Sequence, residues 1–163
     1  MIIIKRWYTT LSFTLFFAVI GCATGEKFYK SNGENNLYIE NKTEPNSFSE
    51  VRATFLYVYE VTSVCKLDYL GQVTLDKPTL TVGLPVGKPL LLTVEFASRS
   101  RFDESTLRNS SSYLLRPRPG YDYTTNIQHQ KKSYKFVLWE NSHGGGAKRL
   151  VERKGLDTCV PRH

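Results

Sequence analysis

The chain has 163 residues and a formal net charge of +7 at pH 7. This length is the size of one domain with one hydrophobic core, and it excludes an assembly of several large domains. A moderate excess of basic residues favours anionic surfaces such as lipid headgroups, lipopolysaccharide or acidic polymers.

The amino terminus has the layout of an export signal. Lys5 and Arg6 precede an apolar run from Leu11 to Ile20, and a basic segment followed by about 7 to 15 apolar residues is typical of a secretory signal. The run is too short to cross a bilayer, which takes about 20 apolar residues. Residues 1–21 are therefore predicted to be a signal peptide, and their removal lowers the net charge from +7 to +5. Nucleic acid is not an expected partner of an exported protein.

The signal ends at Val19-Ile20-Gly21-Cys22, which resembles the lipobox of bacterial lipoproteins. The resemblance implies cleavage before Cys22 and acylation of its thiol and new amino group, with palmitate among the acyl chains. Two or more acyl chains hold a protein stably on a membrane, whereas one does not. Ala23 follows the cysteine in place of aspartate, which implies an outer-membrane lipoprotein facing the periplasm. The alternatives are an ordinary signal with an incidental Cys22, or a short buried helix.

Residues 22–50 differ in composition from the rest of the chain. They are rich in Asn, Glu, Ser and Lys and poor in aliphatic residues. Such a composition predicts a lipidated, flexible tether ahead of the folded domain, in which the run NLYIE can add an edge strand.

Cys65 and Cys159 are the remaining cysteines. An even pair in an oxidising compartment predicts a disulfide between them. In the chain-entropy model a bridge closing so long a loop stabilises the fold by up to about 4 to 5 kcal/mol. Two unrelated buried thiols are the alternative.

From residue 51 the chain consists of short runs dense in β-branched and aromatic residues. Alternation is clearest at residues 80–84 and 90–96, where every second residue is apolar and shares one face of a strand. Turns containing Pro and Gly separate the runs. This spacing predicts an all-β fold, a small antiparallel β-sandwich over residues 51–163. Residues 102–112 are the one place where a short helical turn is expected.

Two stretches resemble parts of known sandwiches. LTVGLPVGKPLLLTVEF is similar to a hairpin of prealbumin-like or immunoglobulin-like domains. YLLRPRPGYDYTTNIQ is similar to a pattern of bacterial envelope lipoproteins, in which a strand, a Pro-Gly turn and a tyrosine-rich strand follow one another. The residues that carry this second pattern are Tyr113, Leu115, Pro119, Gly120, Tyr121 and Tyr123. The resemblance spans roughly residues 51–140, implies one of these two sandwich subclasses and identifies no specific family.

The motif His143-Gly144-Gly145-Gly146 resembles the HGGG loop of lipases and esterases, whose backbone N–H groups form an oxyanion hole. The sequence lacks the Gly-x-Ser-x-Gly nucleophile motif of those enzymes, so a flexible glycine loop is the favoured interpretation. The histidines lack the spacing of a zinc site, and the acidic residues form no calcium-loop pattern. No catalytic residue, metal or cofactor is predicted, and the chain is not expected to be an enzyme.

Basic and aromatic residues gather in the second half of the chain. Arginine and tyrosine often anchor interfaces, although a solvated face and the blunting of a sheet edge by lysines are the simpler alternatives. The candidate binding surface comprises Arg116, Arg118, Tyr121, Tyr123, Lys131 and Lys132.

The sequence therefore predicts a membrane-anchored, non-enzymatic lipoprotein whose sandwich binds another envelope protein. The first alternative is a module that binds peptidoglycan, lipopolysaccharide or another anionic cell-surface polymer, or inhibits a foreign enzyme. The second is a small envelope hydrolase.

Overall fold

The computed structural model describes residues 26–31, 33–44, 46–63, 66–103, 105–130 and 133–152. These residues contain no helix long and apolar enough to cross a membrane. Their regular secondary structure consists of strands, which loops and turns connect: β1 (Leu37–Lys42), β2 (Glu50–Ser63), β3 (Lys66–Thr74), β4 (Thr79–Val82), β5 (Leu90–Ser100), β6 (Thr106–Leu115), β7 (Tyr121–Gln130), β8 (Ser133–Ser142) and β9 (Arg149–Leu150).

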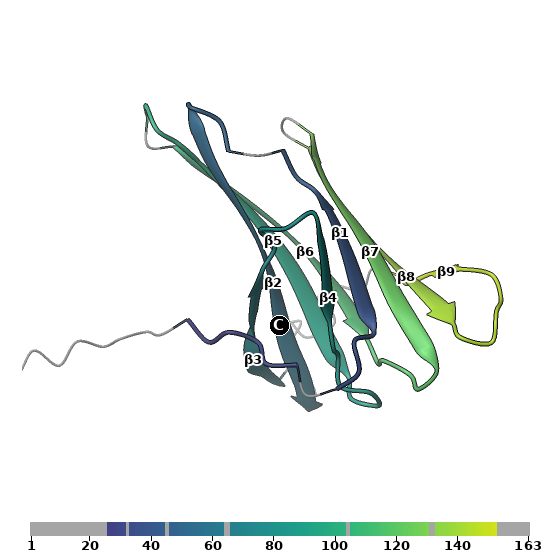
Figure 1. Cartoon of the computed structure of the whole chain (residues 1–163). Coiled ribbons are helices and arrows are strands. Elements are labelled where there is room, and N and C mark those ends of the chain that lie inside the picture. Colours follow the sequence, from purple (N-terminus) through teal and green to yellow (C-terminus); the bar gives the residue numbers. More distant parts are fainter. Residues whose placement is uncertain are drawn as a thin grey trace, which may run out of the picture.

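The strands form two sheets that pack face to face (Figure 1). The β1 sheet has the order β4-β1-β7-β8-β9, and the β2 sheet has the order β3-β2-β5-β6. All neighbouring strands run antiparallel except β1 and β7, which run parallel. The prediction of a small, predominantly antiparallel β-sandwich is confirmed.

The strand order bears on the two subclasses that the sequence left open. In immunoglobulin-like sandwiches the second and third strands lie in opposite sheets. Here β2 and β3 pair with each other along most of the length of β3. This order favours the prealbumin-like alternative.

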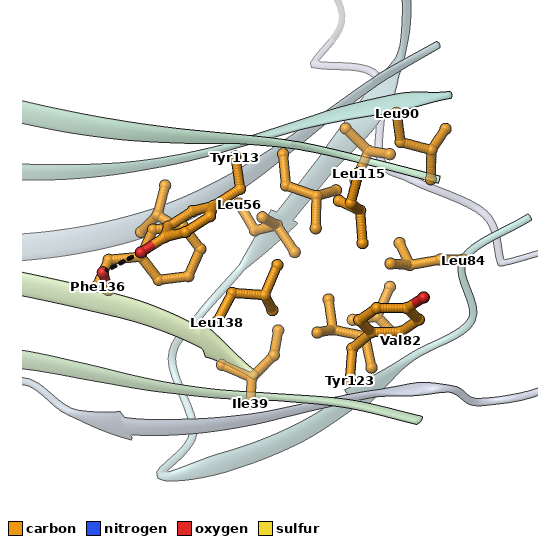
Figure 2. Packing of buried hydrophobic residues seen from close by; sticks show 14 of the residues in the cluster. Ile39, Leu56, Val82, Leu84, Leu90, Tyr113, Leu115, Tyr123, Phe136 and Leu138 are labelled. Carbon is orange, nitrogen blue, oxygen red and sulfur yellow. Dashed lines mark hydrogen bonds between the residues drawn. The ribbon is translucent and has the colours of Figure 1, made fainter. Parts of the chain in front are cut away.

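The core lies between the sheets and follows the predicted alternation. Leu90, Leu92 and Val94 of β5 are at most 1% exposed and form one inward face. Tyr113 of β6 packs edge-on against Phe136 of β8, with ring centroids 4.8 Å apart. The Tyr113 hydroxyl donates a hydrogen bond to the Phe136 carbonyl at 2.9 Å (Figure 2). This bond joins the two sheets through the middle of the core.

The helical turn expected within residues 102–112 does not occur in the described part of that range. Residues from Thr106 onward belong to β6, which pairs antiparallel with β5. Ser111, Tyr113 and Leu115 form its buried face. The prediction was wrong because β6 lies at a sheet edge, where a strand can carry serine and asparagine and so lose its apolar alternation.

The predicted boundary between tether and domain is also wrong, because the sandwich begins well before residue 51. β1 lies between β4 and β7 inside a sheet, and Leu37 and Ile39 are 1% and 2% exposed. The Asn36 side chain accepts a hydrogen bond from the Leu84 backbone N–H at 2.7 Å and donates one to the Leu84 carbonyl at 3.0 Å. Two buried aliphatic residues are therefore enough to hold a strand as short as β1 in the middle of a sheet. Residues 22–25 lie outside the described part of the chain.

Residues 26–29 extend this ordered region along the edge of β3. The Tyr29 N–H donates to the Gln72 carbonyl at 2.8 Å, and the Gln72 N–H donates to the Lys27 carbonyl at 2.9 Å. Gly71 allows this approach, because a Cβ there would lie 2.6 Å from the backbone of Tyr29. The φ of Gly71 is +146°, which residues with a side chain rarely adopt.

We expect Gly71→Ala to detach residues 27–29 from β3, because the new methyl group would occupy the space of the Tyr29 backbone. Hydrogen exchange at the Tyr29 and Gln72 amides should accelerate by about ten-fold or more. Gly87→Ala is the matched control, since Gly87 also has a positive φ, of +80°, but no atom lies within 4 Å of an added Cβ. Unchanged protection of both amides in Gly71→Ala would show that the segment is not held in this way.

His129 of β7 is buried between the sheets, with 2% of its surface exposed. Its ring stacks on Phe96 of β5 at a centroid distance of 3.9 Å. Neither ring nitrogen has a hydrogen-bond partner among the described residues. Burial lowers the pKa of His129 below its ordinary value of 6.5, and the charge of Arg52 lowers it further, while Glu44 and Glu50 oppose the shift. The buried imidazole is therefore neutral at pH 7.

The free energy of unfolding should fall as the pH decreases from about 7 to about 5.5. Below pH 6.5 the unfolded chain takes up a proton at His129 before the folded chain does, so protonation favours unfolding. Urea denaturation at both pH values measures the difference, which should shrink in His129→Phe. His143→Asn should retain it, because the His143 side chain is exposed beside Asp122. The explanation fails if wild type and His129→Phe lose equal stability on acidification.

Candidate binding surfaces

The predicted basic and aromatic residues do not come together as one exposed surface. Arg116 and Arg118 lie in the turn between β6 and β7, and both are exposed. Tyr123, however, is 1% exposed, so it is a core residue and not a contact residue. Lys131 and Lys132 lie outside the described residues.

Arg118 is held by contacts within the chain. Its guanidinium donates to both carboxylate oxygens of Glu140, at 3.1 and 2.5 Å, and lies 3.9 Å from the centroid of the Tyr121 ring. The Tyr123 hydroxyl donates to Glu140 at 3.0 Å and accepts from the Arg118 backbone N–H at 3.2 Å. Burial raises the pKa of Tyr123, which keeps this hydroxyl protonated. The charge of Arg118 is therefore matched internally, and Arg116 is the member of the pair without such an ion pair among the described residues.

The glycine loop that begins at His143 connects β8 to β9 and has structural contacts of its own. The Nε2 atom of His143 lies 3.0 Å from a carboxylate oxygen of Asp122, and the His143 N–H donates to the Gly120 carbonyl at 2.9 Å. The Gly144 N–H, which an oxyanion hole would use, is directed at the Ser142 hydroxyl at 3.3 Å. Within the described ranges no three His, Cys, Asp or Glu side chains converge as a metal site.

An apolar surface lies on the outer face of the β2 sheet. Leu56 and Val58 of β2 point into the core, where they are 1% and 0% exposed. The residues that alternate with them therefore point away from the core. An antiparallel sheet normally carries polar residues on such a face. Here five successive outward positions are apolar, and we call them the outer apolar stripe: Val51, Ala53, Phe55, Tyr57 and Tyr59. At about 3.3 Å per residue, the stripe is about 26 Å long.

The aromatic rings of the stripe contact one another and a tyrosine of β3. Ring centroids of Phe55 and Tyr57 are 6.2 Å apart, and Tyr69 lies 6.4 Å from Tyr57 and 5.3 Å from Tyr59. Burial raises the pKa of all three tyrosines, and the carboxylate of Glu95 raises those of Tyr57 and Tyr59 further. Their hydroxyls therefore stay protonated and can donate hydrogen bonds.

Two further aromatic side chains lie at the end of the sandwich where the stripe begins. Phe48 precedes β2 and Phe102 follows β5, and they are 85% and 72% exposed. Their ring centroids are 5.9 Å apart. The Arg101 N–H donates to the Ser49 carbonyl at 2.9 Å and holds the two loops together. The sheet face thus ends in an exposed pair of aromatic rings.

The stripe was not predicted from the sequence, although the sequence contains a signal for it. In VRATFLYVYE, residues 51–60, apolar side chains occupy both alternating sets of positions. A strand with that pattern is typically covered on both faces. Because the described chain covers only the inward face of β2, the pattern indicates a surface that a partner can bury.

A groove of about 640 Å³ crosses the outer face of the β1 sheet. Four residues on neighbouring strands lie side by side across it: Thr81 of β4, Tyr38 of β1, Thr124 of β7 and Trp139 of β8. Lys148, from the loop before β9, extends over Trp139, with its Nζ 5.5 Å from the ring centroid. The groove therefore combines two aromatic side chains and several hydroxyls with one cation, Lys148, and one carboxylate, Glu40.

A comparison with models of known protein families found no match, and comparisons with curated proteins and with solved structures found none either. The two outer faces of the sandwich and the amino-terminal sequence are therefore the features of this chain that indicate a function.

Proposed function

We propose that this chain is a lipid-anchored, non-enzymatic protein of a bacterial envelope that binds another envelope protein through the outer apolar stripe. The observation that carries the proposal is the unbroken row of apolar side chains on the solvent face of β2. The lipid anchor follows from the lipobox-like sequence ending at Cys22, and Ala23 supports an outer-membrane location facing the periplasm.

The chemistry of the stripe suits a protein partner. Tyrosine and phenylalanine are enriched at the centres of protein interfaces, where unpaired charges are depleted. Glu95, which lies opposite Phe55 on β5, pairs with Arg108 at 3.4 Å. The exposed Arg99 lies opposite Val51, at the end of the stripe. The ring contacts of Tyr57 and Tyr59 with Tyr69 restrict the side chains before binding, which lowers the entropy lost on association.

Affinity recovery of the full-length protein from cross-linked cells tests this proposal. We expect one dominant protein partner with the wild type and a loss of about ten-fold or more with Tyr57→Glu, because the substitution buries a carboxylate at the centre of the contact. Tyr38→Glu is the matched control, since Tyr38 is an exposed tyrosine on the outer face of the opposite sheet.

Arg116→Glu tests the surface that the sequence suggested. If the stripe makes the contact, this variant should recover the partner as the wild type does. Unchanged recovery with Tyr57→Glu, or recovery of no protein by the wild type, would contradict the proposal. Thermal unfolding of each variant shows whether a loss of recovery reflects a loss of folding.

A further inference from the structure

We propose that the groove on the outer face of the β1 sheet binds an acidic oligosaccharide. This site lies on the opposite face of the sandwich from the outer apolar stripe, so it is independent of the proposed protein contact. Its volume of about 640 Å³ falls within the range of about 300 to 1,000 Å³ that is usual for ligand sites.

The two aromatic side chains are spaced for linked sugars. Tyr38 and Trp139 are separated by one strand position, occupied by Thr124. Adjacent strands are about 4.8 Å apart, so the two rings stand about 10 Å apart across the groove. Tyr38 is 43% exposed and available for contact. Tyrosine and tryptophan offer an apolar ring and a polar group together, which suits the apolar C–H faces and the hydroxyls of a sugar ring.

The floor of the groove has an unsatisfied hydrogen-bond acceptor. The Asn126 amide nitrogen donates to Glu40 at 2.8 Å, whereas the buried Oδ1 atom of Asn126 has no partner within the described ranges. A buried acceptor without a partner costs about 1 to 3 kcal/mol. This oxygen has less than 1 Å² of accessible surface, so a ligand hydroxyl reaches it only after the side chain shifts. The hydroxyls of Thr81 and Thr124 line the groove and can both donate and accept hydrogen bonds.

The charges at the groove favour an anionic sugar. Glu40 is matched by Lys42, with 3.1 Å between the ammonium and the carboxylate. Lys148 lies over Trp139 and forms no ion pair with a carboxylate in the part of the chain that the structure describes. It therefore offers a positive charge beside an aromatic platform, where the carboxylate of an acidic sugar would lie.

Other ligand classes fit this site less well. An added peptide strand needs a free sheet edge, but the floor here is formed by β1 and β7, each of which has a strand on both sides. Nucleic acid binds through several phosphates, each matched by a cation, and Lys148 is a single charge. Most of the polar side chains that line the groove carry hydroxyl or amide groups.

Binding to an array of immobilised acidic and neutral oligosaccharides, including uronic, sialic and muramic acids, tests the proposal directly. We expect full-length protein in detergent to be retained on acidic oligosaccharides in preference to neutral ones. A retained oligosaccharide is then titrated in solution against the mature protein, residues 22–163, in which Trp139 is the only tryptophan. Its fluorescence should change saturably, because Trp139 lines the groove.

Variants locate the site. Tyr38→Ala should weaken binding by about ten-fold or more, and Lys148→Gln should remove the preference for acidic over neutral sugars. Leu114→Ala and Lys66→Gln are the matched controls, because both residues are exposed and belong to the other sheet, and they should bind as the wild type does. The proposal is overturned if no acidic oligosaccharide is retained, or if Tyr38→Ala and Lys148→Gln bind as tightly and selectively as the wild type.

Discussion

Replacing Cys22 with serine is expected to abolish acylation of the protein entirely. The thiol of Cys22 is the atom that the lipobox resemblance assigns to the diacylglycerol, and acylation of the new amino group requires cleavage before residue 22. Intact mass spectrometry of the wild type should give the mass of residues 22–163 with a thioether-linked diacylglycerol and an amide-linked acyl chain. The Cys22→Ser protein should carry no acyl chain and incorporate no labelled palmitate.

Ala23→Ser and Cys65→Ser serve as controls for this result. Both leave the thiol at position 22 in place, so both proteins should carry the same acyl mass as the wild type. Retention of acyl chains by Cys22→Ser would contradict the lipid anchor, as would a wild-type mass that matches an unmodified chain. The anchor matters physically because two or more acyl chains make membrane attachment stable.

A large loss of stability is expected when the predicted disulfide between Cys65 and Cys159 is removed. Both cysteines lie outside the described residues, so the bridge remains a prediction. Cys65 stands in the sequence between Ser63, which ends β2, and Lys66, which begins β3. A bridge from this hairpin to Cys159 would close the chain from β3 to β9 into one loop. In the chain-entropy model such a loop contributes about 4 to 5 kcal/mol.

Removing the bridge with Cys65→Ser and Cys159→Ser together should lower the thermal midpoint by roughly 10 to 20 °C, given a domain of this size. Reducing agent should lower the midpoint of the wild type by a similar amount and leave the double variant unchanged. Two free thiols in the intact mass of the untreated protein would rule the bridge out.

The strands that the sequence predicted well are those whose alternation is visible locally. The inward face of β5 from Leu90 to Phe96 follows from every second residue being apolar and buried. The order of the strands could not be predicted in the same way. β1 pairs with β7, about 85 residues further along the chain. No local pattern in NLYIE indicates which strand will pair with it.

The candidate binding surfaces show the same limit. Proximity in the sequence placed Arg116, Arg118 and Tyr123 on one surface, but Glu140, in the next strand, pairs with Arg118. Tyr123 is buried because its side chain points from β7 toward the opposite sheet. The groove likewise takes Tyr38, Thr124 and Trp139 from three separate parts of the chain. The outer apolar stripe, by contrast, lies within one strand, so its alternation could have been recognised from the sequence alone.

The most direct test of the central claim is cross-linking inside cells with a photoreactive amino acid at position 57 of the full-length, anchored protein. The matched position is 135, an exposed position of β8 in the opposite sheet that lies outside the groove. If the outer apolar stripe binds an envelope protein, ultraviolet light should give one heavier product from position 57 and not from position 135. No product from position 57, or equal products from both positions, would contradict the account.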